Sequence, residues 1–238
     1  MKLAGWILFG LGLLSLLPCT LHFRRDFLLI FFSMAMLGLA NINTDISFYH
    51  VLNMATLLPL AAIIPYCVSR FILKDYHIQF HYCHIKNWYR IGILSIFISA
   101  ATAYFVFPLY LKDTGSYLNW KIIPETGYLT WFCIWIIVLA IWEELIFRGA
   151  FLGLFRRYFP FTIANLTQSI LSTSFLYELG FRGWGFALIF MFALIQGYIF
   201  KKTESLLSVI LIHLTMDIIF FLAIINASYP SLFPLFLK

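Results

Sequence analysis

Two adjacent carboxylates, Glu143 and Glu144, lie inside one of the most apolar stretches of the chain, residues 130–155. A charged side chain at the centre of a bilayer costs at least about 2.5 kcal/mol, so ionisable groups at that depth indicate a functional site. On a helix, Glu144 and Arg148 are four residues apart and share a face, which allows them to pair. Glu143 points to another face. The pattern predicts that Arg148 holds Glu144 ionised, while Glu143 faces a cavity whose surroundings shape its pKa.

A second polar pair, His213 and Asp217, lies inside the last apolar run of the chain. These two side chains are also four residues apart and share a helical face. An imidazole and a carboxylate placed in this way can bind a metal, orient a water or stabilise an oxyanion.

Both constellations have a structural alternative. Glu143, Glu144 and Arg148 could form a buried salt bridge between helices, although one guanidinium compensates only one of two carboxylates. His213 and Asp217 could hydrogen-bond one helix to another. We favour function because both constellations occur in one small membrane segment.

The composition predicts an integral membrane protein. Of the 238 residues, 63% are hydrophobic, 20% are aromatic and 11% are charged, and the mean hydropathy is +0.93. Soluble domains carry about 25% charged residues. The net charge of +6 does not indicate nucleic-acid binding, because the basic residues form short clusters between apolar spans. We expect the protein to be embedded in a lipid bilayer.

The hydropathy pattern predicts an all-α fold, a polytopic membrane bundle of about eight transmembrane helices. The expected spans are residues 3–21, 27–41, 51–73, 91–111, 127–155, 161–179, 184–200 and 205–225. The first, third, fifth and seventh connections are basic, and the others are nearly neutral. The positive-inside rule therefore predicts that the basic connections are cytoplasmic and both termini are not. In a bacterium, the membrane would be the plasma (inner) membrane.

The two polar constellations resemble signatures of a known family. EELIFR, from Glu143 to Arg148, matches an EExxxR signature, and His213 to Asp217 matches Hxxx(N/D). The chain resembles the CPBP family, which includes Rce1-like CAAX prenyl proteases and bacteriocin-processing or immunity (Abi) proteins. The resemblance implies a CPBP-like catalytic membrane core at residues 127–226. The membrane helices expected at residues 1–126 carry no signature of the family, and residues 227–238 are expected to form a tail.

What the resemblance implies is an intramembrane endopeptidase that cleaves a membrane-associated peptide or protein substrate, expected near the cytoplasmic side. Glu143 would be the general base that activates water, and Glu144, held by Arg148, would support it. His213 and Asp217 would stabilise the oxyanion. The resemblance leaves open a glutamic or a metal mechanism, with a divalent metal such as zinc as the cofactor.

The chain departs from the family at a further motif, FxxxH. The span at residues 161–179 contains no histidine: Phe175 can match the Phe, but the position four residues later is Leu179. The nearest polar candidates to replace the histidine are Tyr177 and Glu178. Asp217 matches the signature, which allows Asn or Asp, but the two differ chemically: an Asn amide donates to an oxyanion, whereas an ionised Asp repels it.

Two other functions remain open from the sequence. One is a catalytically inactive CPBP-like protein that binds a partner or confers bacteriocin immunity. The other is a small transporter or proton relay that uses the buried carboxylates. A separate segment carries His77, His81 and His84, but their spacing fits no structural zinc site closely, and we interpret it as an interfacial loop.

Overall fold

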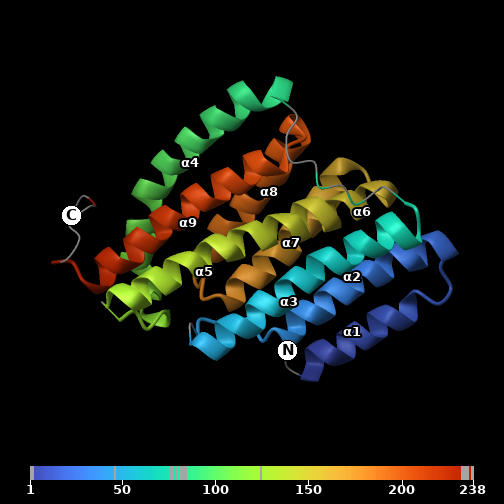
Figure 1. The fold of residues 1–238 in the computed structure, drawn as a ribbon, viewed down its shortest axis with the longest axis horizontal. Coiled ribbons are helices and arrows are strands. Elements are labelled where there is room, and N and C mark those ends of the chain that lie inside the picture. Colours follow the sequence, from blue (N-terminus) through green and yellow to red (C-terminus); the bar gives the residue numbers. More distant parts are fainter. Residues whose placement is uncertain are drawn as a thin grey trace.

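A computed structural model of residues 1–238 describes residues 3–45, 47–75, 78, 80, 85–123, 125–231 and 236. Within these ranges the regular structure is helical throughout (Figure 1), which confirms the predicted all-α class. His77, His81 and His84 lie outside the described residues.

The helices follow one another with short connections. The first half contains α1 (Leu3–Ser15), α2 (Leu21–Leu39), α3 (Phe48–Cys67), a π-helical turn η1 (Val68–Ile72), α4 (Ile85–Thr114) and a 3₁₀ turn η2 (Ser116–Asn119). The second half contains α5 (Thr126–Glu144), the π-helical segment η3 (Leu145–Phe151), α6 (Leu152–Tyr158), α7 (Phe161–Glu178), α8 (Gly185–Thr203) and α9 (Leu206–Ser228). Because α5, η3 and α6 are continuous, the described part of the chain forms eight long helical segments.

Five of these segments are long and apolar enough to cross a bilayer. They are Phe48–Ile72, Arg90–Thr114, Gly127–Tyr158, Gly185–Thr203 and Leu206–Ser228. The chain is therefore a multi-pass membrane protein. The other three predicted spans are helical, but α1 has only 13 residues, α2 carries three charges near its start, and α7 is rich in hydroxyl and amide side chains.

Helix α9 occupies the interior of the bundle, where it packs against α4 and α5, while α2 packs on α3 and α7 on α8 (Figure 1). Large apolar side chains fill these contacts: Phe220 of α9 meets Phe107 of α4 with ring centroids 4.9 Å apart. Between α2 and α3, the Ser33 hydroxyl donates to the Ala61 carbonyl at 2.7 Å. The interior position of α9 brings its polar residues against α5 and η3.

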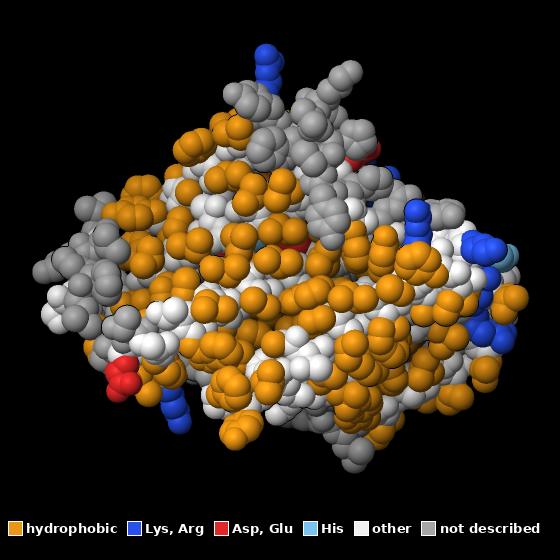
Figure 2. All heavy atoms as spheres, in the orientation of Figure 1, with side chains coloured by type: hydrophobic (Ala, Val, Ile, Leu, Met, Phe, Trp, Pro, Cys, Tyr) orange, Lys and Arg blue, Asp and Glu red, His pale blue; other side chains and the backbone are white. Residues whose placement is uncertain are grey.

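One end of the bundle is basic. Lys and Arg side chains gather mainly at one end of an otherwise apolar face (Figure 2), and basic residues occupy the last turns of η1, α6 and α8. At this end the buried carboxylate of Asp26 accepts from Arg157 at 2.8 Å and from the Tyr158 hydroxyl at 2.6 Å. Arg157 also pairs with Asp75. These contacts hold the ends of α2 and α6 to the segment after η1, whereas the orientation of this end in the membrane stays a prediction.

Candidate active site

Glu143 and Glu144 end α5 at the point where the backbone changes to the π-helix η3. π-Helical insertions in α-helices are frequent at functional sites. Both side chains are almost completely buried, with exposed fractions of 1% for Glu143 and 0% for Glu144. The sequence predicted an ordinary α-helix here, and the wider π-helical turns were not visible in the pattern.

Glu144 lies between two cationic or ionisable groups. Its Oε2 is 3.2 Å from Arg148 Nε, and its Oε1 is 2.6 Å from His213 Nδ1. All three side chains are no more than 3% exposed. An ionised carboxylate only accepts hydrogen bonds, so Nδ1 of His213 donates when Glu144 is ionised. Arg148, Glu144 and His213 therefore form a buried chain from η3 to α9.

The other ring nitrogen of His213 faces Glu143 and Asp217. His213 Nε2 lies 3.8 Å from Glu143 Oε2 and 3.7 Å from Asp217 Oδ1. These separations are too long for direct hydrogen bonds and suit a bridge through one water. The structure thus brings the side chains of Glu143, His213 and Asp217 together between α5 and α9.

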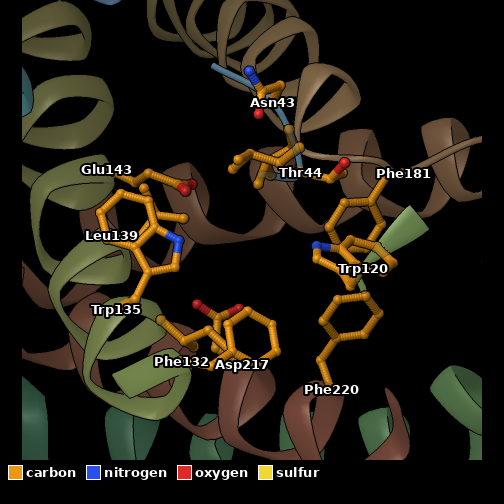
Figure 3. Close-up of a pocket in the computed structure, with 13 residues that line it drawn as sticks. Asn43, Thr44, Trp120, Phe132, Trp135, Leu139, Glu143, Phe181, Asp217 and Phe220 are labelled. Atoms are coloured by element: carbon orange, nitrogen blue, oxygen red, sulfur yellow. The ribbon is translucent and has the colours of Figure 1, made fainter. Parts of the chain in front are cut away.

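Glu143 and Asp217 line a cavity of about 50 Å³, which is large enough to hold water. Figure 3 shows both carboxylates directed into it from α5 and α9. The other lining residues are mostly apolar or aromatic: Asn43, Thr44, Trp120, Phe132, Trp135, Ile136, Leu139, Leu176, Leu179, Phe181 and Phe220. Carboxylates in such surroundings interact more strongly with a bound molecule than they would in bulk water.

The cavity reaches toward the end of the bundle opposite the basic one. Asn43 lies between α2 and α3, Trp120 between α4 and α5, and Phe181 between α7 and α8. These are the nearly neutral connections, which the positive-inside rule places outside the cytoplasm. The expected cleavage near the cytoplasmic side and the expected topology therefore cannot both hold, because the cavity and the basic clusters lie at opposite ends.

The loop that carries Asn43 and Thr44 was not predicted from the sequence to belong to the site. Asp45 shapes this loop: its carboxylate accepts from the Ser47 backbone N–H at 2.9 Å and from the Ser47 hydroxyl at 3.0 Å. The Ser47 backbone hydrogen bond lowers the pKa of Asp45 below its ordinary value. Asn43 in turn accepts from the Asp45 backbone N–H at 2.7 Å. The polar run at 41–45 between apolar spans was the only signal in the sequence.

Leu179 lines the cavity at the position where the FxxxH signature has its histidine. The two suggested replacements do not reach the site. Tyr177 is 40% exposed, and Arg182 stacks over its ring at 3.8 Å. Glu178 is exposed and lines a different groove, between α1, α2 and α7. The place of the missing histidine is therefore taken by an apolar side chain.

The described residues do not fit a catalytic zinc site. Such a site needs three protein ligands with nitrogen, oxygen or sulfur atoms. Within the described ranges, no group of three His, Cys, Asp or Glu side chains is arranged to hold a metal ion. Leu179 offers no ligand atom at the wall where a second imidazole would stand.

A comparison with known protein families identifies the domain that carries this site. Residues 125–219 match the family model described as type II CAAX prenyl endopeptidase Rce1-like. This stretch of the chain is an Rce1-like domain. The match confirms the resemblance predicted from the EExxxR and Hxxx(N/D) signatures. No curated protein and no solved structure matches the chain. The Rce1-like domain contains α5, η3, α6, α7, α8 and the part of α9 that carries His213 and Asp217.

Proposed function

We propose that the Rce1-like domain is a glutamate-dependent intramembrane endopeptidase. The observation that carries this proposal is the pair of carboxylates, Glu143 and Asp217, that line one water-sized cavity, with His213 Nε2 3.8 Å from Glu143 Oε2 and 3.7 Å from Asp217 Oδ1. A general base must lie within hydrogen-bond reach of the proton that it removes, directly or through one water. Glu143 meets this requirement for a water bound beside Nε2.

Glu143 is the base in the proposed reaction. Its carboxylate takes a proton from the water, the hydroxide oxygen bonds to the peptide carbonyl carbon, and the C=O electron pair moves to the carbonyl oxygen. Glu143 then gives the proton to the amide nitrogen, and the C–N bond breaks to leave an acid and an amine. We assign this work to Glu143 and not to Glu144, because Glu144 does not line the cavity and its Oε1 is bonded to His213 Nδ1.

His213 supports both halves of this reaction. When the imidazole is neutral, Nδ1–H donates to Glu144 and Nε2 accepts a hydrogen bond from the water. When the imidazole is doubly protonated, Nε2 donates and can bind an oxyanion. Arg148 and Glu144 fix the ring in the orientation that both roles need.

The substrate is a peptide or protein at the membrane, and the family description points to a prenylated CAAX substrate. The apolar and aromatic cavity wall suits an apolar segment next to the scissile bond. By the positive-inside rule the cavity end is non-cytoplasmic, and we place the cleaved bond on that side.

The test uses the full chain in proteoliposomes with a farnesylated, fluorophore-quencher peptide that ends in a CAAX motif. Glu143→Gln keeps the shape of the side chain but removes the base, so hydrolysis should fall by about 10²- to 10⁴-fold. Glu178→Gln is the matched control, since this exposed carboxylate lies away from the cavity. N-terminal peptide analysis of membranes from cells that produce either protein extends the test to unknown substrates. New termini that do not depend on Glu143 would contradict the proposal.

One observation favours a second function. Leu179 lines the cavity at the position where the FxxxH signature has a histidine. An apolar side chain there is expected for an Rce1-like protein that binds a partner without cleaving it. This alternative predicts no Glu143-dependent termini in the same experiment, together with a cellular phenotype that survives Glu143→Gln.

A further inference from the structure

Two tryptophan side chains line the cavity from opposite sides. Trp135 comes from α5 and Trp120 from the segment after η2, and both indole nitrogens point into the cavity (Figure 3). Trp135 is 5% exposed and Trp120 is 7% exposed. Trp120 is fixed by edge-on contacts with Phe181 and Phe220, at centroid distances of 6.1 Å and 5.3 Å. The two indole N–H groups are therefore held at defined places in the cavity wall.

Neither indole N–H has a hydrogen-bond acceptor among the described residues, whereas the indole of Trp184 at the bundle surface donates to Asp113 at 2.8 Å. Neither nitrogen is among the fully buried atoms that lack a partner, so both N–H groups are accessible from the cavity, and an indole N–H in such a place usually has a partner. Two such donors in one cavity indicate that a molecule with an acceptor oxygen enters between them.

The cavity needs donors for a hydrolytic reaction. Asp217 can only accept hydrogen bonds when it is ionised, and Leu179 has no polar atom. His213 donates from Nε2 only after it takes up a second proton. An indole N–H, in contrast, donates at every pH at which the protein is folded. The tryptophans are donors that do not depend on protonation, as are two residues of the loop between α2 and α3: the Asn43 amide, which already donates to the Asn41 carbonyl at 2.9 Å, and the Thr44 hydroxyl.

We propose that Trp135 donates its indole N–H to the oxyanion of the tetrahedral intermediate, and that Trp120 donates to the adjacent backbone carbonyl of the extended substrate. This inference rests on the proposed endopeptidase function. Trp135, Leu139 and Glu143 all line the cavity. They follow one another at four-residue steps along α5, so they lie on one side of the helix. The base and the donor therefore belong to one wall of the cavity. Trp135 keeps its proton throughout, so the proton balance of the reaction is unchanged.

Trp135→Phe tests this inference, because it keeps an aromatic ring and removes only the N–H. Loss of an oxyanion donor lowers kcat by about 10²- to 10³-fold, and KM for the farnesylated peptide should change by less than about threefold, since the bond forms mainly in the transition state. Trp131→Phe is the control: Trp131 is on the same helix and its indole nitrogen also has no partner, but it does not line the cavity. Equal kcat values for the two variants would overturn the inference.

A second measurement separates this inference from the proposed function. The full chain with ¹⁵N-labelled tryptophan is observed by NMR, with and without a phosphinate analogue of the same farnesylated peptide, in the Glu143→Gln background. Hydrogen bonding should move the Trp135 and Trp120 indole N–H resonances downfield and leave that of Trp131 in place. Unmoved Trp135 and Trp120 resonances at saturating analogue overturn the donor role, whether or not the wild-type protein hydrolyses peptides. Moved resonances in a protein without activity would refute only the endopeptidase proposal.

Discussion

His213 Nδ1 lies 2.6 Å from Glu144 Oε1, so the imidazole of α9 is held by the carboxylate that ends α5. This bond joins two segments that are 69 positions apart in sequence. Because Arg148 holds the other oxygen of Glu144, the two adjacent glutamates have different surroundings. Glu144 orients the imidazole, while Glu143 lines the cavity. The division between a supporting and a reactive carboxylate follows from this geometry.

Removal of Arg148 should destabilise the protein strongly. In Arg148→Met, Glu144 would be left as a buried carboxylate without its guanidinium, and breaking a buried ion pair costs about 3–5 kcal/mol. Arg148 and Glu144 are 1% and 0% exposed, so solvent does not weaken this effect. The measurement is the unfolding free energy in detergent, followed by tryptophan fluorescence.

The double variant Glu144→Gln, Arg148→Met is the control for this prediction. It removes the buried charge as well as its partner, so at least half of the lost stability should return. A double variant no more stable than Arg148→Met would mean that Arg148 acts through packing and not through the ion pair.

The sequence predicted the helical class and the polar centre because both depend on local patterns. The four-residue spacing of Glu144 and Arg148, and of His213 and Asp217, fixes which side chains share a face whatever the rest of the fold does. Apolar length likewise identified the helices, and five of them are confirmed as long enough to span. Helix α7 was predicted as a span but is not among these five, and its buried side chains include Asn165, Gln168 and Ser172.

The cavity wall could not be predicted, because connections between helices supply much of it. Asn43, Thr44, Trp120 and Phe181 meet only after the whole bundle is folded, and no local spacing relates them. The π-helix η3 was also unpredictable from the apolar pattern. The tryptophan on α5 was within reach of the sequence: Trp135, two turns before Glu143, shares its helical face.

Leu179→His should raise the rate of peptide hydrolysis. The new imidazole would enter the cavity wall at the position where Leu179 now lies, and would help to orient the water or carry its proton. A positioned acid or base contributes typically 10²–10⁴-fold, and we expect an increase of about tenfold or more because the site did not evolve around this group. The measurement is kcat for the farnesylated peptide.

Leu176→His supplies the comparison for that gain, because Leu176 also lines the cavity but lies at no signature position. An equal change of kcat in both variants would show that an added imidazole has the same effect at either position. An unchanged kcat in Leu179→His would show that the missing histidine does not limit hydrolysis.

Gly180→Ala should lower both stability and activity. Gly180 has φ of +101°, and a Cβ there would lie 2.6 Å from Thr44 Cγ2 and 3.1 Å from Trp120 Cζ2. A non-glycine residue in such a backbone conformation costs about 1–3 kcal/mol, and both contacts belong to the cavity wall. Thermal unfolding and peptide hydrolysis measure the two effects.

Gly10→Ala is the control, because a Cβ at Gly10 of α1 would meet no atom within 4 Å. Replacing a glycine inside a helix by alanine stabilises by roughly 0.5–1 kcal/mol, so this variant should unfold at the same temperature as the wild type or slightly above. If Gly180→Ala behaved in the same way, the close packing of Thr44 and Trp120 on this turn would be wrong.

The side of the membrane that the cavity faces can be measured with single cysteines in a variant without native cysteines. Leu118 of η2 is 71% exposed at the cavity end, and Glu204 is exposed between α8 and α9 at the basic end. With basic ends in the cytoplasm, a membrane-impermeant maleimide added outside intact cells should label Leu118→Cys and leave Glu204→Cys unlabelled until the cells are opened. The reverse pattern would turn the cavity toward the cytoplasm and, with it, the bond that Glu143 is proposed to cleave. The basic clusters at the ends of α6 and α8 would then lie outside the cytoplasm, against the positive-inside rule. A substrate on the cytoplasmic side would become the expected one.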